Sequence, residues 1–469
     1  MQAMTRLMAI LISIFVLTVP AEAQRPRPLG WAMDAMRSGN WDAAAALAAR
    51  DGQVAVDVIE WHRLRAGRGS YAEARDFLNR RPDWPGEAYL RRQTEEAVIK
   101  QSQDDILDFF SAMAAQTPRG VLAHAKALID SGQRGEAEAN LVLAWRTMPM
   151  NATSQELFVD AHGSLLAPHH AARLEEMLWQ REHSEARQMF DLVSSADKAL
   201  AETRIALQKL ESDVNTKIDA LPASKADAPG LAHDRFEWRI RKGFGDDAKA
   251  LLLQRSTSAA ALGQPPKWSN RRRAMARDEM RNGDPKTAYQ IASQHFLTSG
   301  SDFADLEWLS GYIALRFLND PTTALGHFQN HDNAVESPIS QGRAGYWQGR
   351  ALEAMGDAEG AAKAYAMGAK YQTSFYGLLA AERGGIPFDE KLTGAAPAQD
   401  WRTSPLARAP LFEAGLLLQA SGELSTAERF WTHLAEQLVP EDIALLGQAA
   451  IDAGQPHLAV MIGKRAAQR

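Results

Sequence analysis

The sequence predicts an all-α protein built from repeated helical hairpins. One pattern recurs along the chain: a glycine or asparagine, then a polar residue, then a helix rich in alanine and aromatic residues. Three examples are "NGDPKTAYQIA" from Asn282, "LNDPTTALGHF" from Leu318 and "MGDAEGAAKAY" from Met355. No sustained alternation of apolar and polar residues competes with this pattern, so no β-sheet is expected.

The residues of each turn explain why one helix ends and the next begins. Gly283 or Asn319 is expected to end a helix in the left-handed conformation. Asp284 then caps the following helix, and Pro285 takes its first position, where a missing N–H costs nothing. Asp320 and the proline after it repeat this arrangement.

The spacing of these turns predicts the architecture. The capping residues Asp284, Asp320 and Asp357 follow one another at steps of 36 and 37 positions. These steps match helix–turn–helix repeats of the tetratricopeptide kind, of about 34 residues, which stack into a right-handed superhelix because one pair cannot bury its apolar face alone. The alanines expected to let the paired helices approach closely are Ala288, Ala324, Ala362 and Ala427.

Stretches rich in proline, glycine and serine predict loops and domain limits. The predicted loops are 221–230, 263–269 and 386–405. The third is long enough to separate a superhelical domain at 24–385 from a smaller helical linker region at 406–469.

The first residues predict export. Arg6 precedes an apolar run from Leu7 to Val19, and an Ala-Glu-Ala site places cleavage before Gln24, which defines a signal peptide at 1–23. The run is short for a membrane span, and no later run is long enough. With no cysteine in the chain, stability must come from the apolar core, and the expected location is a bacterial periplasm.

Charge and motif content exclude several functions. A net charge of -6 gives no basic field for nucleic acid. Glu95-Glu96 and Glu175-Glu176 are expected on solvated helix faces. His169-His170 lacks the spacing of a metal site, and Arg271 to Arg273 is expected to be one exposed helix turn rather than a phosphate site. No metal or other cofactor is predicted.

The most suggestive polar residues lie in "SQGRAGYWQGRALEAMGD". Arg343, Tyr346 and Arg350 recur at steps of three and four, so they share a helix face. Together with Tyr376 they are candidates for binding an anionic, sugar-rich ligand by charge and stacking. The alternative, left open by the sequence, is that the arginine stems cover an aromatic core.

The stretch "YQTSFYGLLAAERGG" carries the same two alternatives, a sugar site or helix packing. At helical pitch Tyr371, Phe375 and Leu378-Leu379 form a continuous apolar stripe, which predicts core packing. Gly384-Gly385 then predicts the end of the helix.

Taken together, four segments resemble the soluble lytic murein transglycosylases. They are 268–295, 302–328, 337–357 and 369–385, and the likeness is strong from Leu231 onward. The resemblance implies a helical superhelix that closes into a ring, a helical linker domain and a lysozyme-like catalytic domain. It also implies binding of peptidoglycan and cleavage of its MurNAc-β-1,4-GlcNAc bonds to 1,6-anhydro products, by one glutamate and without a cofactor.

This sequence departs from the family at the catalytic motif. Its Glu-Ser pairs are Glu211-Ser212, followed by Asp213, and Glu336-Ser337, followed by Pro338, and neither has a Gly-Leu-Met-Gln stretch later. No catalytic residue is therefore assigned, and the chain by itself is expected to be inactive, ending before a catalytic domain. Its expected role is to position glycan strands or to scaffold that domain. The alternative is a repeat-based scaffold that binds cell-wall proteins.

Overall fold

The computed structural model describes residues 27–394, 397 and 399–468, and these residues contain helices and no strand. The predicted all-α superhelical fold is confirmed. The signal peptide predicted at 1–23 lies outside the described residues. Within the described part of the chain, no helix is both long and apolar enough to cross a membrane.

Contacts divide the chain into two compact units, and the first joins helices from both ends of the sequence (residues up to 94 and 397–463). Its helices are α2 (Pro28–Arg37), α3 (Trp41–Ala48), α4 (Gln53–Arg65), α5 (Tyr71–Arg80), most of α6 (Glu87–Val98), α26 (Pro410–Ala420), α27 (Leu424–Ala435), α28 (Pro440–Asp452) and most of α29 (Pro456–Ala466).

Aromatic packing holds the two halves of this first unit together. The rings of Trp61 and Trp84 meet Phe430 of α27 edge-on, with centroids 5.2 and 5.0 Å apart. At the rim, a nitrogen of Arg37 lies 2.5 Å from a carboxylate oxygen of Glu423. The C-terminal helices are therefore anchored on the N-terminal ones through a buried aromatic cluster.

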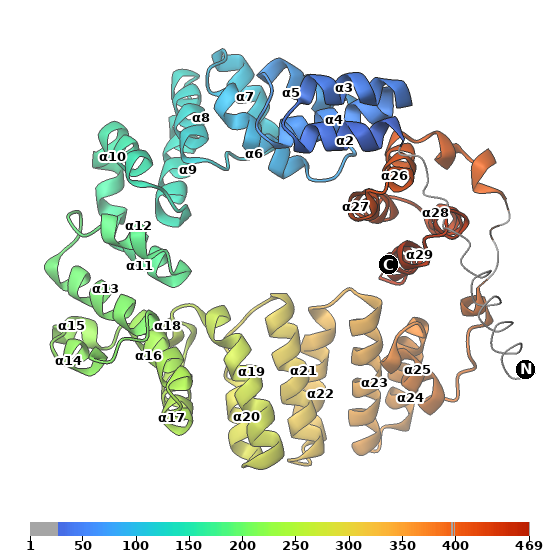
Figure 1. Cartoon of the computed structure of the whole chain (residues 1–469). Coiled ribbons are helices and arrows are strands. Elements are labelled where there is room, and N and C mark those ends of the chain that lie inside the picture. Colours follow the sequence, from blue (N-terminus) through green and yellow to red (C-terminus); the bar gives the residue numbers. More distant parts are fainter. Residues whose placement is uncertain (1–26, 395–396, 398, 469) are drawn as a thin grey trace, which may run out of the picture. The chain divides into compact units, whose positions relative to one another are not determined.

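The second unit (95–396 and 464–469) is a row of successive helices (Figure 1). It contains α7 (Gln103–Ala112), α8 (Pro118–Asp130), α9 (Arg134–Thr147), α10 (Ala152–Leu166), α11 (His170–Gln180), α12 (His183–Gln188), α13 (Ser195–Gln208), α14 (Val214–Asp219), α15 (Ala223–Ala226), α16 (Pro229–Arg241), α17 (Gly245–Arg255), α18 (Ala259–Leu262), α19 (Pro265–Asn282), α20 (Pro285–Ser293), α21 (Gly300–Arg316), α22 (Pro321–Asn333), α23 (Pro338–Ala354), α24 (Ala358–Gly368) and α25 (Phe375–Arg383).

The predicted turn chemistry is largely confirmed. The Asp284 side chain accepts the N–H of Thr287, and the Asp320 side chain accepts the N–H of Thr323, so each caps its helix. Asn319 is left-handed with φ 53°. The prediction for Gly283 is wrong: its φ is -124°, because α19 ends on an ordinary hydrogen bond from the Gly283 N–H to the Glu279 carbonyl.

The predicted close-packing alanines are buried, with one exception. Ala288, Ala324 and Ala427 are at most 1% exposed. Ala362 is exposed, and its neighbour Ala361 is buried instead. The reason is helical register: the packing position lies four residues after the capping aspartate, and Ala361 is the residue four after the cap of α24.

The predicted loop at 263–269 is also wrong in part, because α19 begins at Pro265. Two prolines fit the first positions of a helix, where no N–H is needed, so their presence marks a start rather than a loop. Trp268, in the first turn of α19, is fully buried, and its indole N–H donates to the carbonyl of Leu262 at 3.1 Å. That buried indole anchors the first turn of α19.

Glycines on α23 let three helices meet closely. A Cβ on Gly345 would lie 2.4 Å from the backbone nitrogen of Gly368 on α24. A Cβ on Gly342 would lie 3.3 Å from Cα of Gly377 on α25. These approaches bring α24 and α25 against α23, the helix that carries three of the predicted site residues.

Candidate functional site

The structure brings three of the four predicted site residues together where α23 meets α25. The ring centroid of Tyr346 lies 5.5 Å from that of Tyr376. A guanidinium nitrogen of Arg350 donates to the Tyr346 hydroxyl at 2.9 Å. Next to them, the ring of Phe375 lies 5.2 Å from Tyr376 and is 69% exposed. We call Tyr346, Arg350, Phe375 and Tyr376 the α23–α25 surface.

Arg343, the fourth predicted residue, faces other helices. Its guanidinium lies 4.9 Å from the ring centroid of Trp308 and donates to Asp305 at 3.3 Å, both on α21. It also lies 3.4 Å from a ring nitrogen of His331. Its side chain is 21% exposed, so Arg343 covers an aromatic ring and keeps only one edge in solvent.

Burial decides what each residue of the α23–α25 surface can contribute. Tyr346 is 9% exposed and its hydroxyl already accepts from Arg350, so it supports its neighbours rather than offering a free ring face. Arg350 is 23% exposed on its side chain and Tyr376 is half-buried. The exposed ring of Phe375 is the part of this surface that can lie flat against the apolar face of a sugar.

The prediction that Phe375 and Leu378 pack in the core is wrong, since Phe375 is 69% and Leu378 44% exposed. The packing face of α25 consists instead of Gly377, Ala380 and Ala381. Small residues occupy it because α25 runs so close to α23 that no large side chain fits between them. The predicted helix end is confirmed: α25 stops at Arg383, and Gly385 is left-handed.

Two charged predictions are also corrected by burial. Glu95 is 1% exposed, and its carboxylate accepts the N–H groups of Gln116 and Thr117 before α8. Arg272 is 1% exposed and donates to the carbonyl of Ile291 and the hydroxyl of Ser256, each at 2.7 Å. Burial lowers the pKa of Arg272 to about 10. Both are structural hydrogen-bonding groups, not solvated charges.

A buried polar network joins α20, α21 and α22. Glu307 of α21 is 6% exposed, and its carboxylate is hydrogen-bonded to His295, His327 and Asn330. The Tyr289 hydroxyl lies 2.9 Å from the other ring nitrogen of His327. Burial opposes ionisation of Glu307, but the bonds from both histidines prevail and lower its pKa to about 2. The network therefore ties α20, α21 and α22 together around one carboxylate.

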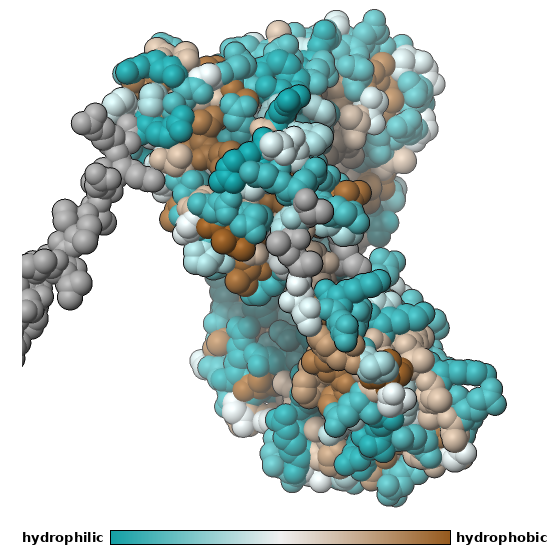
Figure 2. Space-filling model, turned by 90° about the vertical axis from the view of Figure 1, so that its right-hand side faces the viewer, coloured by the Kyte–Doolittle hydropathy of each residue, from teal (hydrophilic) through white to brown (hydrophobic). Residues whose placement is uncertain are grey.

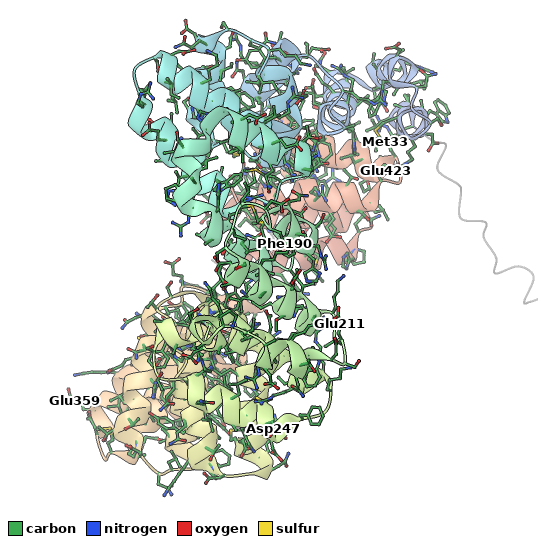
Figure 3. The ribbon with its side chains drawn as sticks, turned by 90° about the vertical axis from the view of Figure 1, so that its left-hand side faces the viewer. Met33, Phe190, Glu211, Asp247, Glu359 and Glu423 are labelled. Carbon is green, nitrogen blue, oxygen red and sulfur yellow. The ribbon has the colours of Figure 1, made fainter. Side chains whose placement is uncertain are left out.

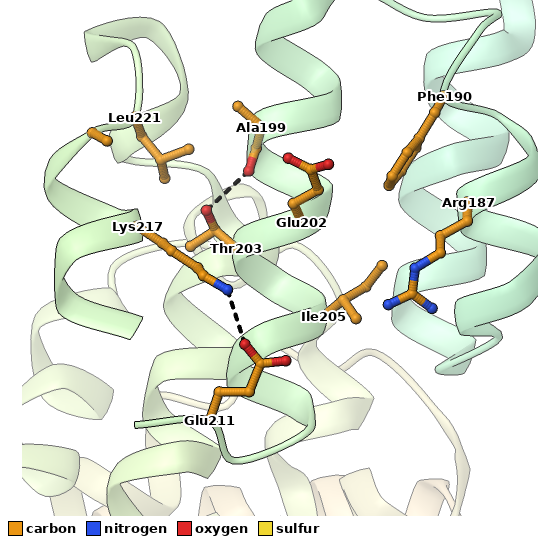
Figure 4. A pocket seen from close by; sticks show the side chains of 10 residues that line it. Arg187, Phe190, Ala199, Glu202, Thr203, Ile205, Glu211, Lys217 and Leu221 are labelled. Carbon is orange, nitrogen blue, oxygen red and sulfur yellow. Dashed lines mark hydrogen bonds and ion pairs between the residues drawn. The ribbon is translucent and has the colours of Figure 1, made fainter. Parts of the chain in front are cut away.

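A pocket of about 420 Å³ opens between α12, α13 and α14 (Figure 4). Phe190 and Arg187 face Glu202 across it, and Lys217 donates to Glu211 at 2.9 Å, which raises the pKa of Lys217. Figure 3 labels Phe190 and Glu211 on this part of the second unit. Two cationic and two anionic side chains line the pocket, so it favours neither sign of ligand charge.

His169 precedes α11 and His170 begins it, and the ring of His170 lies 5.4 Å from that of Trp145. Over the described ranges, no group of three or more His, Asp or Glu residues is arranged to hold a metal ion.

Comparison with known proteins gives a likeness of fold. No family model matches the sequence, and no curated protein matches it. Among solved structures, an inactive mutant of the lytic transglycosylase Slt from Pseudomonas aeruginosa aligns with a TM-score of 0.60 at 18% identity, covering 94% of this chain and 71% of that chain. The chain shares the superhelical fold of Slt.

A second similar structure is the 70-kDa soluble lytic transglycosylase in complex with bulgecin A. It aligns with a TM-score of 0.53 at 14% identity, covering 94% of this chain and 70% of that chain. Both alignments extend along nearly the whole chain, so the likeness includes helices of both compact units.

Proposed function

We propose that this chain is the peptidoglycan-binding superhelical part of a soluble lytic transglycosylase and acts in the periplasm. The observation that carries the proposal is the alignment of 94% of the chain with two such enzymes, at identities of 18% and 14%. The sequence resemblance of segments between 268 and 385 supports it independently of the fold. The proposal includes the predicted domain limits, a superhelical domain at 24–385 and a linker region at 406–469, although by contacts the residues 397–463 form one compact unit with the residues up to 94.

The proposed role is to hold glycan strands or to position a catalytic domain against them. Within the described residues the α23–α25 surface is the best candidate for contact with a glycan strand, because it combines an exposed aromatic ring with a guanidinium group that a hydrogen bond holds in place. The Phe375 ring offers an apolar face, and Arg350, fixed by the Tyr346 hydroxyl, offers donors to sugar oxygens. We assign no bond-cleaving step to any residue of this chain.

A pull-down with insoluble peptidoglycan tests this role. The protein is expected to sediment with purified sacculi, and Phe375→Ser is expected to reduce the bound fraction severalfold. The matched control is Phe244→Ser, which removes another exposed ring, 49% exposed and stacked on Trp238 away from α25. Absence of sedimentation, or equal loss in both variants, would refute strand contact at this surface.

The second candidate function, a scaffold for cell-wall proteins, is favoured by exposed apolar side chains around α25. Phe375, Leu378, Phe388 and Leu392 are each at least 40% exposed. Figure 2, which shows the side carrying α24 and α25 in its lower half, has hydrophobic patches there within a largely hydrophilic surface. Exposed apolar clusters of this kind are common at protein-binding surfaces. Recovery of a purified cell-wall protein but not of sacculi in the same assay would support this function instead.

A further inference from the structure

A cavity of about 580 Å³ lies between α11, α16 and α19, away from the α23–α25 surface. Four cationic side chains line it, and one anionic side chain accompanies them. The cations are Arg181, Arg241, Lys267 and Arg271, and the anion is Glu237. This excess of positive charge occurs in a chain whose net charge is -6, so it is local and not a property of the whole surface.

The floor of this cavity, which we call the basic cavity, is closely packed. Trp179 and His233 form it, 6% and 7% exposed, with ring centroids 5.0 Å apart. Beneath Trp179 lies the guanidinium of Arg204, 5.1 Å from the ring centroid and fully buried. Arg204 is itself fixed by Asp234, whose carboxylate lies 2.6 Å away. The cations are therefore mounted on a packed, hydrogen-bonded base.

The cations are only partly neutralised by the protein. Glu237 lies 3.4 Å from Arg271 and 3.6 Å from Arg241, which holds both guanidinium groups at the cavity wall. In the described part of the chain, Arg181 and Lys267 form no ion pair. The charges of Arg181 and Lys267 are thus left for a ligand. The guanidinium groups that pair with Glu237 are held beside them.

The backbone at Arg181 gives an independent reason to assign a function to its side chain. Arg181 follows α11 in the left-handed conformation, with φ 65° and ψ 25°. Its N–H donates to the Leu178 carbonyl, and the next N–H donates to the Met177 carbonyl. Glycine is the residue that adopts this helix-ending conformation without strain. An arginine occupies a position that glycine would fill more stably.

From the basic cavity we infer a binding site for a ligand of about dipeptide size that carries two carboxylates, held by Arg181, Lys267 and Arg271. This site goes beyond the proposed glycan contact and does not depend on it. The planar guanidinium group of an arginine can donate two parallel hydrogen bonds to one carboxylate. The amide oxygen of Asn270 already accepts from Arg273 at 3.2 Å, which leaves its N–H₂ group as a donor for a peptide carbonyl.

Helix chemistry favours carboxylates over phosphate here. Phosphate sites commonly use free backbone N–H groups at a helix N-terminus. The N-terminus of α19 beside this cavity begins with Pro265 and Pro266, which have no N–H, and the Lys267 N–H already donates to Gln264. Recognition therefore rests on side chains, which suits separate carboxylates better than one compact phosphate.

Calorimetric titration with N-acetyl-Ala-Glu, its uncharged diamide and inorganic phosphate tests the inference. The dipeptide diacid is expected to bind, more weakly as salt rises, and the diamide is expected to bind at least tenfold more weakly. Equal affinity for the diamide would overturn the assignment. Tighter binding of phosphate than of the diacid would also overturn it.

The variant Arg181→Gly separates binding from folding. Because glycine relieves the left-handed backbone, its thermal midpoint is expected to equal or exceed that of the original protein, while affinity for the diacid falls about tenfold. Lys267→Gln is expected to weaken binding similarly. The matched control Lys242→Gln removes a charge that lies over Trp238 and does not line the cavity. Unchanged affinity in Arg181→Gly, or equal loss in the control, would refute the site.

Discussion

The buried ion pair beneath the basic cavity gives the sharpest stability prediction. Arg204 of α13 is fully buried and contacts the carboxylates of Asp234 at 2.6 Å and Glu175 at 2.8 Å. The amide of Gln208 donates to Asp234 as well, with both contacts at 3.0 Å. Burial opposes ionisation of Asp234, but the Arg204 charge prevails and lowers its pKa. Arg204→Leu removes that charge and leaves Asp234, which is 2% exposed, without its partner.

The expected loss follows from the cost of an unpaired buried charge. Removing one partner of a buried pair destabilises proteins by about 3–5 kcal/mol. The bonds from Gln208 to Asp234 remain, so we expect the lower end, about 3 kcal/mol. The double variant Arg204→Leu/Asp234→Leu removes both charges and is expected to be at least 1 kcal/mol more stable than Arg204→Leu, since apolar replacement of a whole pair is often tolerated.

Urea unfolding at pH 7 and pH 4 measures the free energy of unfolding of the original protein, of Arg204→Leu and of the double variant. In Arg204→Leu, burial without Arg204 raises the folded-state pKa of Asp234 above its unfolded value of about 3.9. A raised folded-state pKa favours folding at low pH and loses that advantage as pH rises, so the deficit of the variant is expected to be smaller at pH 4 than at pH 7. A deficit below about 1 kcal/mol at pH 7, or one that does not shrink at pH 4, would refute this reasoning.

Two further predictions concern packing and pH. Gly345→Ala is expected to destabilise the protein by about 1–3 kcal/mol or more in urea unfolding, because its Cβ would lie 2.4 Å from the backbone of α24. Gly326→Ala on α22, which meets nothing within 4 Å, is the control and should be neutral or stabilising; equal effects would contradict the close approach. For His62, burial and then nearby arginines lower the pKa to about 4. As the pH falls, the unfolded chain therefore takes up a proton at His62 at a higher pH than the folded protein does. The free energy of unfolding is expected to fall by roughly 3 kcal/mol from pH 6.5 to pH 4 because of this proton. That contribution should be absent in His62→Gln.

The sequence by itself determined the features that depend on neighbouring residues. The caps at Asp284 and Asp320, the left-handed Asn319 and the end of α25 at its glycines all follow from chemistry within one turn of a helix. Local signals of this kind also gave the all-α fold and the hairpin repeat, because a helix start and stop are specified within a few residues.

Tertiary structure decided which face of each helix is buried and which charges meet. Phe375 is exposed and Ala361 is buried because helix spacing and register set the packing face, and these depend on partners distant in sequence. Arg272 is buried while Arg271 lines the basic cavity, although the two are adjacent. Arg181 follows α11, whereas Lys267 and Arg271 lie on α19, and only the packing of α11, α16 and α19 brings their charges around one cavity.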